Sequence, residues 1–315
     1  MGNTLSQAFP PKSRFTVEQI PDLTGQVIIV TGGNAGVGKE TCKALLNKNA
    51  KVYLAARSKS RADTAIEWLR SETNGKEPIF LELDLANLAS IRKAVEDKEQ
   101  ELHVLFNNAG VMVPPVDQRT ADGYDLQFGT NVLGHYHFTT LLLPTLIHTA
   151  KNSPLARGHV RVVNTSSGAV YLAPKGGIVW DTLGTDEASV QAAKKLGANM
   201  LYAQSKLGNV LFSNELAKHY TDQGIISSSL NPGNLQTDLQ RHLPRLAGKI
   251  LGLFLYPASY GALTQLWSGT TPEGESHNGK FLIPWARIGD AGRYGRNEEL
   301  AEKLWAWLEE QVKGH

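Results

Sequence analysis

A cluster of glycines that follows an apolar run near the start of the chain most constrains the fold. Residues 26–30 read Gln-Val-Ile-Ile-Val, residues 31–38 read Thr-Gly-Gly-Asn-Ala-Gly-Val-Gly, and a helical pattern follows over 39–46. Glycines between a strand and a helix let the backbone approach a pyrophosphate closely, and the helix N-terminus adds free N–H groups and partial positive charge. An ordinary tight turn is the alternative, but the position between the first strand and the first helix favours phosphate binding.

Strand and helix patterns alternate along the rest of the chain. Short β-rich runs separated by helical patterns are typical of βαβ units and of a parallel sheet covered on both faces. The predicted strands are residues 26–30, 52–56, 79–83, 104–106, 160–164, 225–230 and 281–283. The predicted helices are residues 39–46, 65–69, 91–95, 125–147, 186–196, 201–219 and 298–312. No linker or repeat divides these elements, so we expect a leader over 1–23 and one doubly wound, Rossmann-type α/β domain over 24–315.

Composition and charge exclude several classes of protein. Of the 315 residues 41% are hydrophobic and 20% are charged, as in ordinary globular domains and unlike disordered or fibrous chains. The formal charge is +2 and no long basic block occurs, so no nucleic-acid partner is expected. The single cysteine, Cys42, cannot form an internal disulfide, which is compatible with a reducing compartment. We therefore expect a cytoplasmic protein.

Two segments bear on membrane association. The chain begins Met-Gly-Asn-Thr-Leu-Ser, which matches the pattern for acylation of Gly2 by a myristoyl chain, although an unmodified flexible start is favoured because the pattern is short. Residues 250–272 carry no charge, but Pro257 and the polar residues after it predict a core helix beginning at Pro257 rather than a membrane span. Weak membrane association through Gly2 or through residues 241–256 is the alternative to a purely cytoplasmic location.

The end of the second predicted strand indicates which dinucleotide binds. In a dinucleotide-binding fold this point meets the adenosine ribose, and a carboxylate there hydrogen-bonds the 2′-hydroxyl. Here residues 55–57 read Ala-Ala-Arg, with no acid. Arg57 would pair a 2′-phosphate bidentately, so NADP is favoured over NAD, and a merely solvated Arg57 fits the missing acid less well.

Further motifs in a fixed order make the sequence similar to the short-chain dehydrogenase/reductase family over nearly all of residues 24–285. The glycine spacing is that of the single-domain branch, and Asn34 is typical of its retinol dehydrogenase-like members. The other motifs are Asp84-Leu85, Asn107-Asn108-Ala109-Gly110, Asn131, Asn164-Thr165-Ser166-Ser167, Tyr202 with Lys206, and Pro232-Gly233 followed by Thr237. The resemblance implies that the cofactor contacts Gly32, Asn34, Gly36, Val37, Gly38, Arg57, Asp84, Leu85, Asn108, Ala109, Gly110, Tyr202, Lys206, Pro232, Gly233 and Thr237.

A tyrosine and a lysine carry the expected chemistry. Tyr202 and Lys206 are four residues apart, so on a helix their side chains share one face. An ammonium beside a phenol favours the phenolate and lowers a pKa that is normally about 10, which suits Tyr202 to act as a general acid. The resemblance implies that Tyr202 protonates a carbonyl oxygen, that Ser167 hydrogen-bonds the same oxygen, and that Lys206 holds the nicotinamide ribose. It also implies that Asn131 binds a water linking Lys206 to solvent, and Ser166 is interpreted as a structural hydroxyl.

Two segments are predicted to wall the substrate pocket. The insert 168–201 is longer than in compact family members and resembles the retinol dehydrogenase-like group; its apolar residues expected at the pocket are Val170, Tyr171, Leu172 and Trp180. The segment 235–256 is rich in leucine, and a mobile lid, an interfacial membrane contact and an amphipathic surface helix stay open for it. Its basic residues recur every four positions, at Arg241, Arg245 and Lys249. Because both segments are apolar, lipophilic aldehydes and ketones, or the corresponding alcohols, are the expected substrates.

No metal site and no subunit interface can be assigned. His135 and His137 lie two residues apart, which on a helix points them to different faces, so they are interpreted as packed or solvated. Trp305 and Trp307 lie on the amphipathic terminal helix and indicate a core or subunit contact, so a homo-oligomer stays open.

The sequence thus predicts an NADPH-dependent carbonyl reductase or alcohol dehydrogenase that transfers hydride to and from a lipophilic carbonyl compound. A catalytically silent dinucleotide-sensing regulatory or scaffold protein on the same fold is the alternative, and a non-redox enzyme is a third reading. The intact set of Asn131, Ser167, Tyr202 and Lys206 favours an enzyme, because a sensor needs the cofactor loop but no acid.

Overall fold

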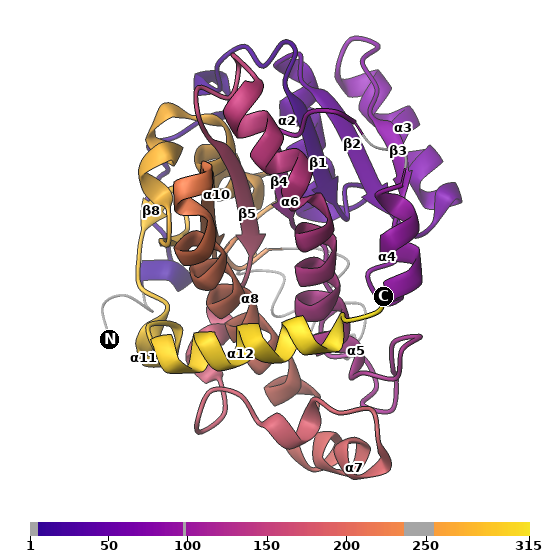
Figure 1. Cartoon of the computed structure of the whole chain (residues 1–315). Helices are drawn as coiled ribbons and strands as arrows, with labels where there is room; N and C mark the ends of the chain where they lie inside the picture. The colour runs from indigo at the N-terminus through magenta and orange to yellow at the C-terminus, as the bar shows by residue number, and fades with distance from the viewer. Residues whose placement is uncertain (1–5, 97–98, 236–254) are drawn as a thin grey trace.

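The short β-rich runs of the sequence form one central sheet (Figure 1). The computed structural model describes residues 6–96, 99–235 and 255–315. Strands follow the order β3-β2-β1-β4-β5-β6-β7-β8, and neighbours are parallel up to β7, which pairs with β8 in antiparallel fashion. The strands are β1 (Val27–Thr31), β2 (Lys51–Ala56), β3 (Ile79–Glu82), β4 (Val104–Asn107), β5 (Val160–Thr165), β6 (Ile225–Leu230), β7 (Phe281–Ile283) and β8 (Arg287–Ile288). This doubly wound arrangement confirms the predicted fold class.

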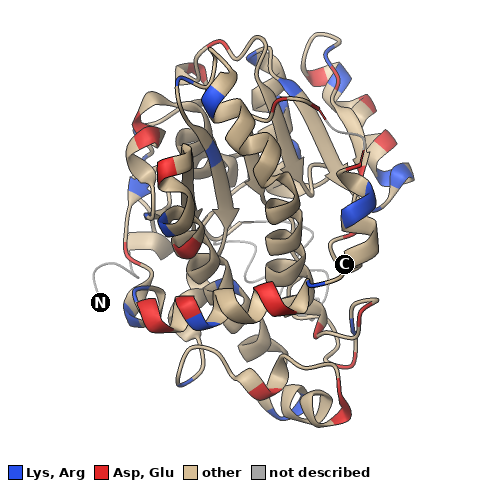
Figure 2. Ribbon diagram, viewed as in Figure 1, with Lys and Arg blue, Asp and Glu red and all other residues tan. Residues whose placement is uncertain are grey.

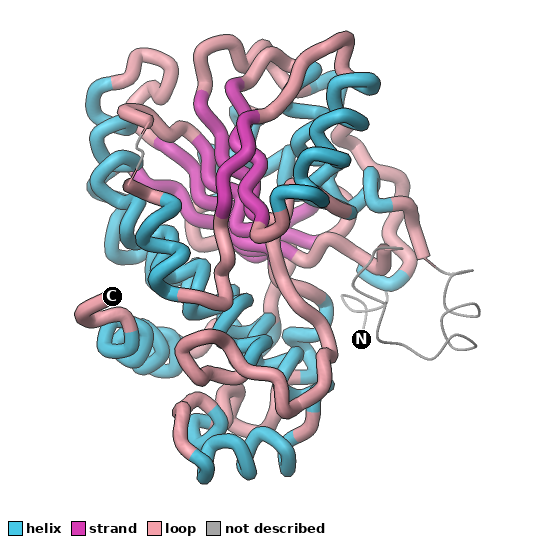
Figure 3. The backbone as a smooth tube through the Cα atoms, turned by 90° about the vertical axis from the view of Figure 1, so that its right-hand side faces the viewer, coloured by secondary structure: helices cyan, strands magenta, loops and turns pink. Residues whose placement is uncertain are grey.

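Helices cover both faces of the sheet, as the edge-on view in Figure 3 shows. Helices α2, α3 and α10 pack on one face, α4, α6 and α8 pack on the other, and α12 lies on α8. The helices are α2 (Gly36–Asn47), α3 (Lys59–Glu72), α4 (Leu88–Ala94), α5 (Leu126–Phe128), α6 (His135–Asn152), α7 (Glu187–Leu196), α8 (Ala198–Tyr220), α10 (Ala258–Thr270), α11 (Gly292–Gly295) and α12 (Glu298–Gln311). The 3₁₀ turns are η1 (Val17–Gln19), η3 (Gly168–Leu172), η4 (Trp180–Thr182), η5 (Thr221–Gln223) and η7 (Pro272–His277).

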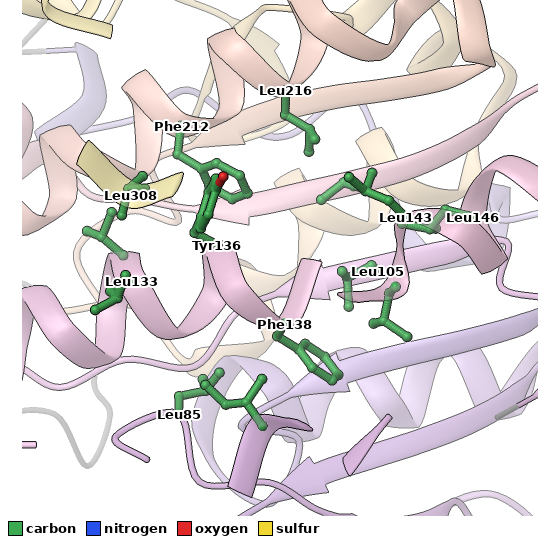
Figure 4. Close-up of a cluster of buried hydrophobic side chains, with 14 of the residues drawn as sticks. Leu85, Leu105, Leu133, Tyr136, Phe138, Leu143, Leu146, Phe212, Leu216 and Leu308 are labelled. Carbon is green, nitrogen blue, oxygen red and sulfur yellow. The ribbon is translucent and has the colours of Figure 1, made fainter. Parts of the chain in front are cut away.

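Alternate residues of the central strands enter two apolar cores, one under each helical layer. In β1, Ile29 joins the core formed with α4, α6, α8 and α12, whereas Ile28 and Val30 join the core formed with α2, α3 and α10. Figure 4 shows part of the first core, where the rings of Tyr136 and Phe212 meet edge to face with centroids 5.7 Å apart. Because strand side chains alternate between faces, both layers bury apolar surface against the same strands, which explains the nearly continuous apolar runs.

The predicted elements are found with small differences at their ends, apart from the region after β4. The helix predicted over 125–147 is α5, a π-helical segment η2 (Gly129–Gly134) and α6. Asp125 begins it, because its side chain accepts the Phe128 N–H at 2.8 Å. The core helix predicted at Pro257 is α10, for which Pro257 is the N-cap residue. The short β8 and α11 were not predicted, since such brief elements show no periodicity.

The terminal helix α12 is amphipathic and packs on α8. Acidic and basic residues are interspersed along it in Figure 2, while its apolar face is buried. Trp305 is 4% exposed and stacks on Phe212 of α8, with ring centroids 6.2 Å apart. Trp307 meets Phe128 edge to face at 5.8 Å. Contacts within the chain therefore account for both tryptophans.

The described part of the predicted leader packs against the domain. Phe15, Ile20 and Leu23 are buried in the core that contains α2, and the Leu23 N–H donates to the Lys48 carbonyl at 2.7 Å. Residues 6–23 therefore add apolar burial to the fold, and the division of the chain at residue 23 stays a prediction.

Within residues 6–96, 99–235 and 255–315, no helix has both the length and the apolar character to cross a membrane. The predictions made for Gly2, Thr237, Arg241, Arg245 and Lys249 concern positions outside the described residues.

Candidate active site

A cavity of about 820 Å³ runs along the carboxyl ends of the parallel strands. In an open α/β sheet ligands bind outside this edge, where the strand order reverses, which is here between β1 and β4. The predicted site residues that line the cavity are Gly32, Asn34, Gly36, Val37, Arg57, Asp84, Leu85, Asn108, Ala109, Gly110, Ser167, Tyr202, Lys206, Pro232 and Gly233. Gly38 and Asn131 lie behind its described lining. The fold thus brings nearly all the predicted residues to one cavity.

The glycine loop places the start of α2 against one side of the cavity. Gly32 and Gly36 have positive φ, +68° and +50°, which a side chain would strain. A Cβ on Gly38 would lie 2.4 Å from the Gly32 carbonyl oxygen, so Gly38 serves the close packing of the helix on the loop. Ala35, the N-cap residue, has no side-chain acceptor, so the first-turn N–H groups of α2 remain available for an anion.

Thr31 ties the glycine loop to the segment after β4. Its Oγ1 accepts the backbone N–H groups of Asn108 and Ala109, each at 2.9 Å, while Asn108 Nδ2 donates to the Thr31 carbonyl at 2.9 Å. His135 Nε2 lies 2.9 Å from Thr31 Oγ1. The walls on either side of the strand reversal are therefore joined by hydrogen bonds.

The first two histidines of α6, His135 and His137, are both buried. His135 is 0% exposed, and its Nδ1 lies 3.0 Å from the carbonyl oxygen of Asn131. Burial lowers the pKa of His135 to about 4, so its ring is neutral near pH 7 and its Nδ1–H donates to that carbonyl. The sequence indicated packing or solvation and missed this bridge between Thr31 and Asn131. In the described part of the chain no group of three or more His, Cys, Asp or Glu residues is placed to hold a metal ion.

Cationic side chains gather at the end of the cavity that follows β2. Arg57 is exposed and lines the cavity together with Lys39 of α2 and Arg61 of α3. Lys39 Nζ lies 3.9 Å from the centroid of the Trp68 ring, a cation–π contact that orients the ammonium. Sequence reasoning found Arg57 and missed the other two. Their signal was available, because Lys39 directly follows the last loop glycine and Arg61 is four residues beyond Arg57.

Asp84 and Leu85 border the same end from the loop after β3. Asp84 Oδ1 accepts the Ala86 N–H at 3.0 Å, and the Ser90 hydroxyl oxygen accepts the Asp84 N–H at 3.1 Å. These local bonds hold the Asp84 carboxylate in a fixed turn at the cavity wall.

Tyr202, Lys206 and Ser167 meet at the other end of the cavity. Tyr202 and Lys206 lie one turn apart on α8, and Lys206 Nζ is 5.8 Å from the centroid of the Tyr202 ring. Lys206 Nζ also donates to the Thr165 carbonyl at 3.1 Å. The Ser166 hydroxyl donates to the Lys206 carbonyl at 2.6 Å and is engaged with the backbone. Ser167 accepts the Ala169 N–H at 3.1 Å, and its hydroxyl also contacts the Tyr202 phenol.

Burial shapes the ionisation of this pair. It raises the pKa of Tyr202, and the contact with the Ser167 hydroxyl acts in the opposite sense. It lowers the pKa of Lys206 to about 8. The sequence-based expectation of a lowered pKa for Tyr202 is therefore wrong in direction for the described structure, because desolvation of the phenol outweighs the effect of the Ser167 hydroxyl. The phenol is consequently protonated near neutral pH.

Asn131 fixes the wall beside these residues. It lies in η2, where its Oδ1 accepts the Val111 N–H at 2.8 Å and its Nδ2 donates to the Val111 carbonyl at 3.0 Å and to Ser205 Oγ at 3.0 Å. Its own carbonyl accepts Asn209 Nδ2 at 2.8 Å. Asn131 thus connects the segment after β4 with α8, next to Lys206.

The walls near Tyr202 differ from those predicted. Val111, Met112, Leu235 and Leu255 supply apolar lining among the described residues. The insert 168–201 contributes none of that lining: Val170 is 2% exposed in a small core, Leu172 is 66% exposed, and Lys303 Nζ covers the Trp180 ring at 4.4 Å. Leu235 does reach the cavity, and residues 236–254 lie outside the described chain.

Comparison with known proteins identifies relatives along the whole chain. A family model described as short chain dehydrogenase matches residues 26–180. A short-chain dehydrogenase/reductase of Armillaria gallica is 54% identical, with the match covering 100% of both chains. One of Phomopsis amygdali is 42% identical over 99% of this chain and 96% of its own.

Solved structures agree with the fold. An uncharacterised protein of Mycobacterium paratuberculosis superposes with a TM-score of 0.71 and 27% identity, covering 96% of this chain and 98% of its own. The motifs that line the cavity and the full-length relatives lead to the same assignment. The chain belongs to the short-chain dehydrogenase/reductase family and is an oxidoreductase that uses a nicotinamide dinucleotide.

Proposed function

We propose that this protein is an NADPH-dependent carbonyl reductase, or an alcohol dehydrogenase in reverse, for lipophilic ketones and aldehydes. One observation carries the proposal: a single cavity has three cationic side chains at one end and Tyr202, Lys206 and Ser167 at the other. Each end matches one part of the reaction, and the glycine loop lines the same cavity.

The residues present fit the cofactor. Gly32 and Gly36, both at positive φ, and the uncapped start of α2 form a loop and helix N-terminus of the kind that a pyrophosphate requires. Arg57, with Lys39 and Arg61, would hold a 2′-phosphate, and β2 ends in Ala55-Ala56 with no acidic residue before Arg57. Asp84 and Leu85 would border the adenine. Asn108, Gly110 and the turn at Pro232-Gly233 would border the nicotinamide end.

The reducing equivalent is the hydride that the bound cofactor supplies to the carbonyl carbon. Tyr202 donates its phenolic proton to the carbonyl oxygen as charge develops there, so that hydride and proton together convert the carbonyl to an alcohol. Ser167 donates a hydrogen bond to the same oxygen and orients it. The raised pKa of Tyr202 keeps this acid protonated near neutral pH, which suits reduction.

Lys206 supplies positive charge beneath the reacting centre. Its ammonium donates to the Thr165 carbonyl and would also donate to the ribose hydroxyls. Lys206 lies one helical turn from Tyr202. A positive charge there stabilises the phenolate left after proton transfer. Asn131 holds the neighbouring wall through Val111 and Ser205, and the roles of all four residues remain part of this proposal.

An apolar substrate fits the described wall. Val111, Met112, Leu235 and Leu255 line the cavity, and burial of apolar surface against them gains about 25 cal/mol per Å². The cationic residues lie at the opposite end, so a charged substrate would have no counter-ion among the lining residues near Tyr202 other than Lys206.

Replacement of Tyr202 by Phe tests the proposal. With NADPH and a panel of carbonyls, Tyr202→Phe should lower turnover by about a hundredfold or more while NADPH still binds, because general acid catalysis contributes on that scale. Tyr220→Phe, at the far end of the same helix, is the matched control and should keep wild-type turnover. Near-native turnover in Tyr202→Phe would refute Tyr202 as the acid, and no NADPH oxidation by the wild type with any carbonyl would favour the catalytically silent sensor.

A further inference from the structure

Gln7 is buried although it lies in the leader, outside the residues that match the family model. Gln7 is only 4% exposed and lies in a helical turn over residues 6–8. Arg287 Nη2 donates to the carbonyl of the adjacent Ser6 at 2.8 Å and anchors this turn. A buried primary amide destabilises the fold unless its donors and acceptor are paired. The hydrogen bonds of Gln7 therefore explain how this segment can be buried.

The amide of Gln7 joins two segments that border the active site. Asn231 Nδ2 donates to Gln7 Oε1 at 2.9 Å, and Gln7 Nε2 donates to the Tyr171 hydroxyl oxygen at 2.8 Å. Asn231 directly precedes the Pro-Gly turn that lines the cavity, and Tyr171 belongs to η3, which begins directly after Ser167. Gln7 thus bridges the two chain segments on either side of the reacting end.

These hydrogen bonds run in one direction, which fixes the orientation of each amide. The Gly233 N–H donates to Asn231 Oδ1 at 3.0 Å, so Asn231 Nδ2 faces Gln7 and needs an acceptor. Gln7 presents Oε1 there and turns Nε2 toward Tyr171, whose hydroxyl donates to the Asp290 carbonyl. An acceptor-only Glu or an apolar side chain at position 7 cannot continue this series.

The two bridged segments are also in close contact. A Cβ on Gly168 would lie 3.2 Å from Asn231 Nδ2, so Asn231 faces the start of η3 directly after Ser167 and only a glycine leaves it this room. Gln7 keeps the two segments together, because it holds Asn231 and Tyr171 through one amide.

We infer that Gln7 is a positioning residue for the reaction, which sets the separation of Ser167 from the Pro-Gly turn. The inference rests on the proposed function, in which Ser167 binds the carbonyl oxygen and the turn borders the nicotinamide. Gln7 acts through Asn231 and Tyr171, since it is not part of the described cavity lining. A misplacement of about 1 Å in such a site costs up to a hundredfold in rate.

A matched pair of substitutions in the full-length protein tests this role. Gln7→Met keeps the length of the side chain and removes both hydrogen bonds. Gln19→Met makes the same change elsewhere in the leader, at an exposed amide that accepts the Thr16 N–H at 2.7 Å. With NADPH and the best carbonyl substrate, Gln7→Met should lower kcat by about ten- to a hundredfold. Its Kd for NADPH should change less than about threefold, and Gln19→Met should resemble the wild type.

A purely structural role gives a different result. Gln7→Met would then lower Tm and leave the kcat of the folded enzyme unchanged, which would overturn the inference. If Gln7→Met does not fold, Tyr171→Phe removes one hydroxyl from the same series and should lower kcat about threefold or more. An unchanged kcat in folded Tyr171→Phe would likewise refute it.

Hydrogen exchange separates this inference from the proposed function. In Gln7→Met, backbone amides of 168–172 and 231–235 should exchange about tenfold faster or more, while those of β1 keep their wild-type rates. A wild type inactive on every carbonyl would refute the proposed function. Unchanged exchange in Gln7→Met would refute the positioning role, whatever the activity.

Discussion

Replacement of Lys206 by Met should abolish turnover and yet stabilise the fold at neutral pH. Lys206 is 4% exposed, its Nζ donates to the Thr165 carbonyl at 3.1 Å, and burial lowers its pKa from 10.5 to about 8. The lysine binds its proton less tightly in the folded than in the unfolded chain. At any pH at which the lysine is protonated in both states, its charge therefore destabilises the folded state.

The magnitude follows from the pKa difference. A gap of roughly 2.5 units corresponds to roughly 3 kcal/mol at about 1.36 kcal/mol per unit. Loss of the hydrogen bond to Thr165 offsets about 1 kcal/mol of this. Lys206→Met should thus gain about 1–3 kcal/mol, or a rise in Tm of about 2–10 °C.

The lowered pKa of Lys206 also predicts how the stability of the wild type changes with pH. Between pH 8 and pH 10.5 the unfolded chain binds more protons at this lysine than the folded chain, so wild-type stability rises with pH across that window. The penalty is complete below about pH 8 and vanishes above about pH 10.5. The stability gap between Lys206→Met and wild type should therefore be largest at pH 7 and close toward pH 10.5.

Urea or thermal unfolding of the protein without cofactor, between pH 6 and pH 10.5, measures this gap. Lys194→Met, an exposed position on α7, makes the same chemical change without burial and should leave stability within about 0.5 kcal/mol. A Lys206→Met variant that is less stable than wild type at pH 7, or a gap that does not change with pH, would refute the reasoning.

Three further outcomes are expected. Arg57→Asp should raise KM for NADPH by about ten- to a hundredfold and leave KM for NADH nearly unchanged. As the control, Arg70→Asp removes an exposed ion pair with Glu77 outside the described cavity lining and should change neither KM. Equal use of both cofactors by the wild type would contradict the assignment of NADPH as the cofactor. Along a homologous series of carbonyls, kcat/KM should rise by about fourfold per added methylene until the apolar wall is filled, and a flat series would mean that the wall does not bind substrate. Mass spectrometry of the native N-terminus tests acylation of Gly2, and an acylated protein should bind vesicles weakly and reversibly, while an unmodified or acetylated terminus excludes this anchor.

Local spacing was enough to predict the parts of the site that lie on one element or one turn. The glycine loop joins β1 to α2, and Tyr202 and Lys206 share one face of α8, so each pattern is complete within a few residues. The order of strands follows from the alternation of periodicities, because parallel strands joined by helices place all their carboxyl ends at one edge. Those features needed no knowledge of tertiary contacts.

Features that depend on distant partners could not be predicted in this way. His135 bridges Thr31 and Asn131 only because α6 passes beneath β1, and Gln7 meets residues more than 150 positions away. The direction in which the pKa of Tyr202 shifts depends on how completely the cavity walls desolvate the phenol, which no i, i+4 spacing reveals. The insert 168–201 was expected at the cavity because it is apolar, yet Val170 is buried in a separate core.

The series from Gly233 through Gln7 to Asp290 also has a consequence for biosynthesis. Gln7 is synthesised 224 residues before its partner Asn231, and Asp290 is made later still. At about 5–20 residues per second, roughly 10–45 s pass between synthesis of the two amides. The nascent leader must therefore wait without its partners, and a chain released before Asp290 has been made lacks the far end of the series. The hydrogen-bonded series beside the active site is therefore complete only after Asp290 has been synthesised.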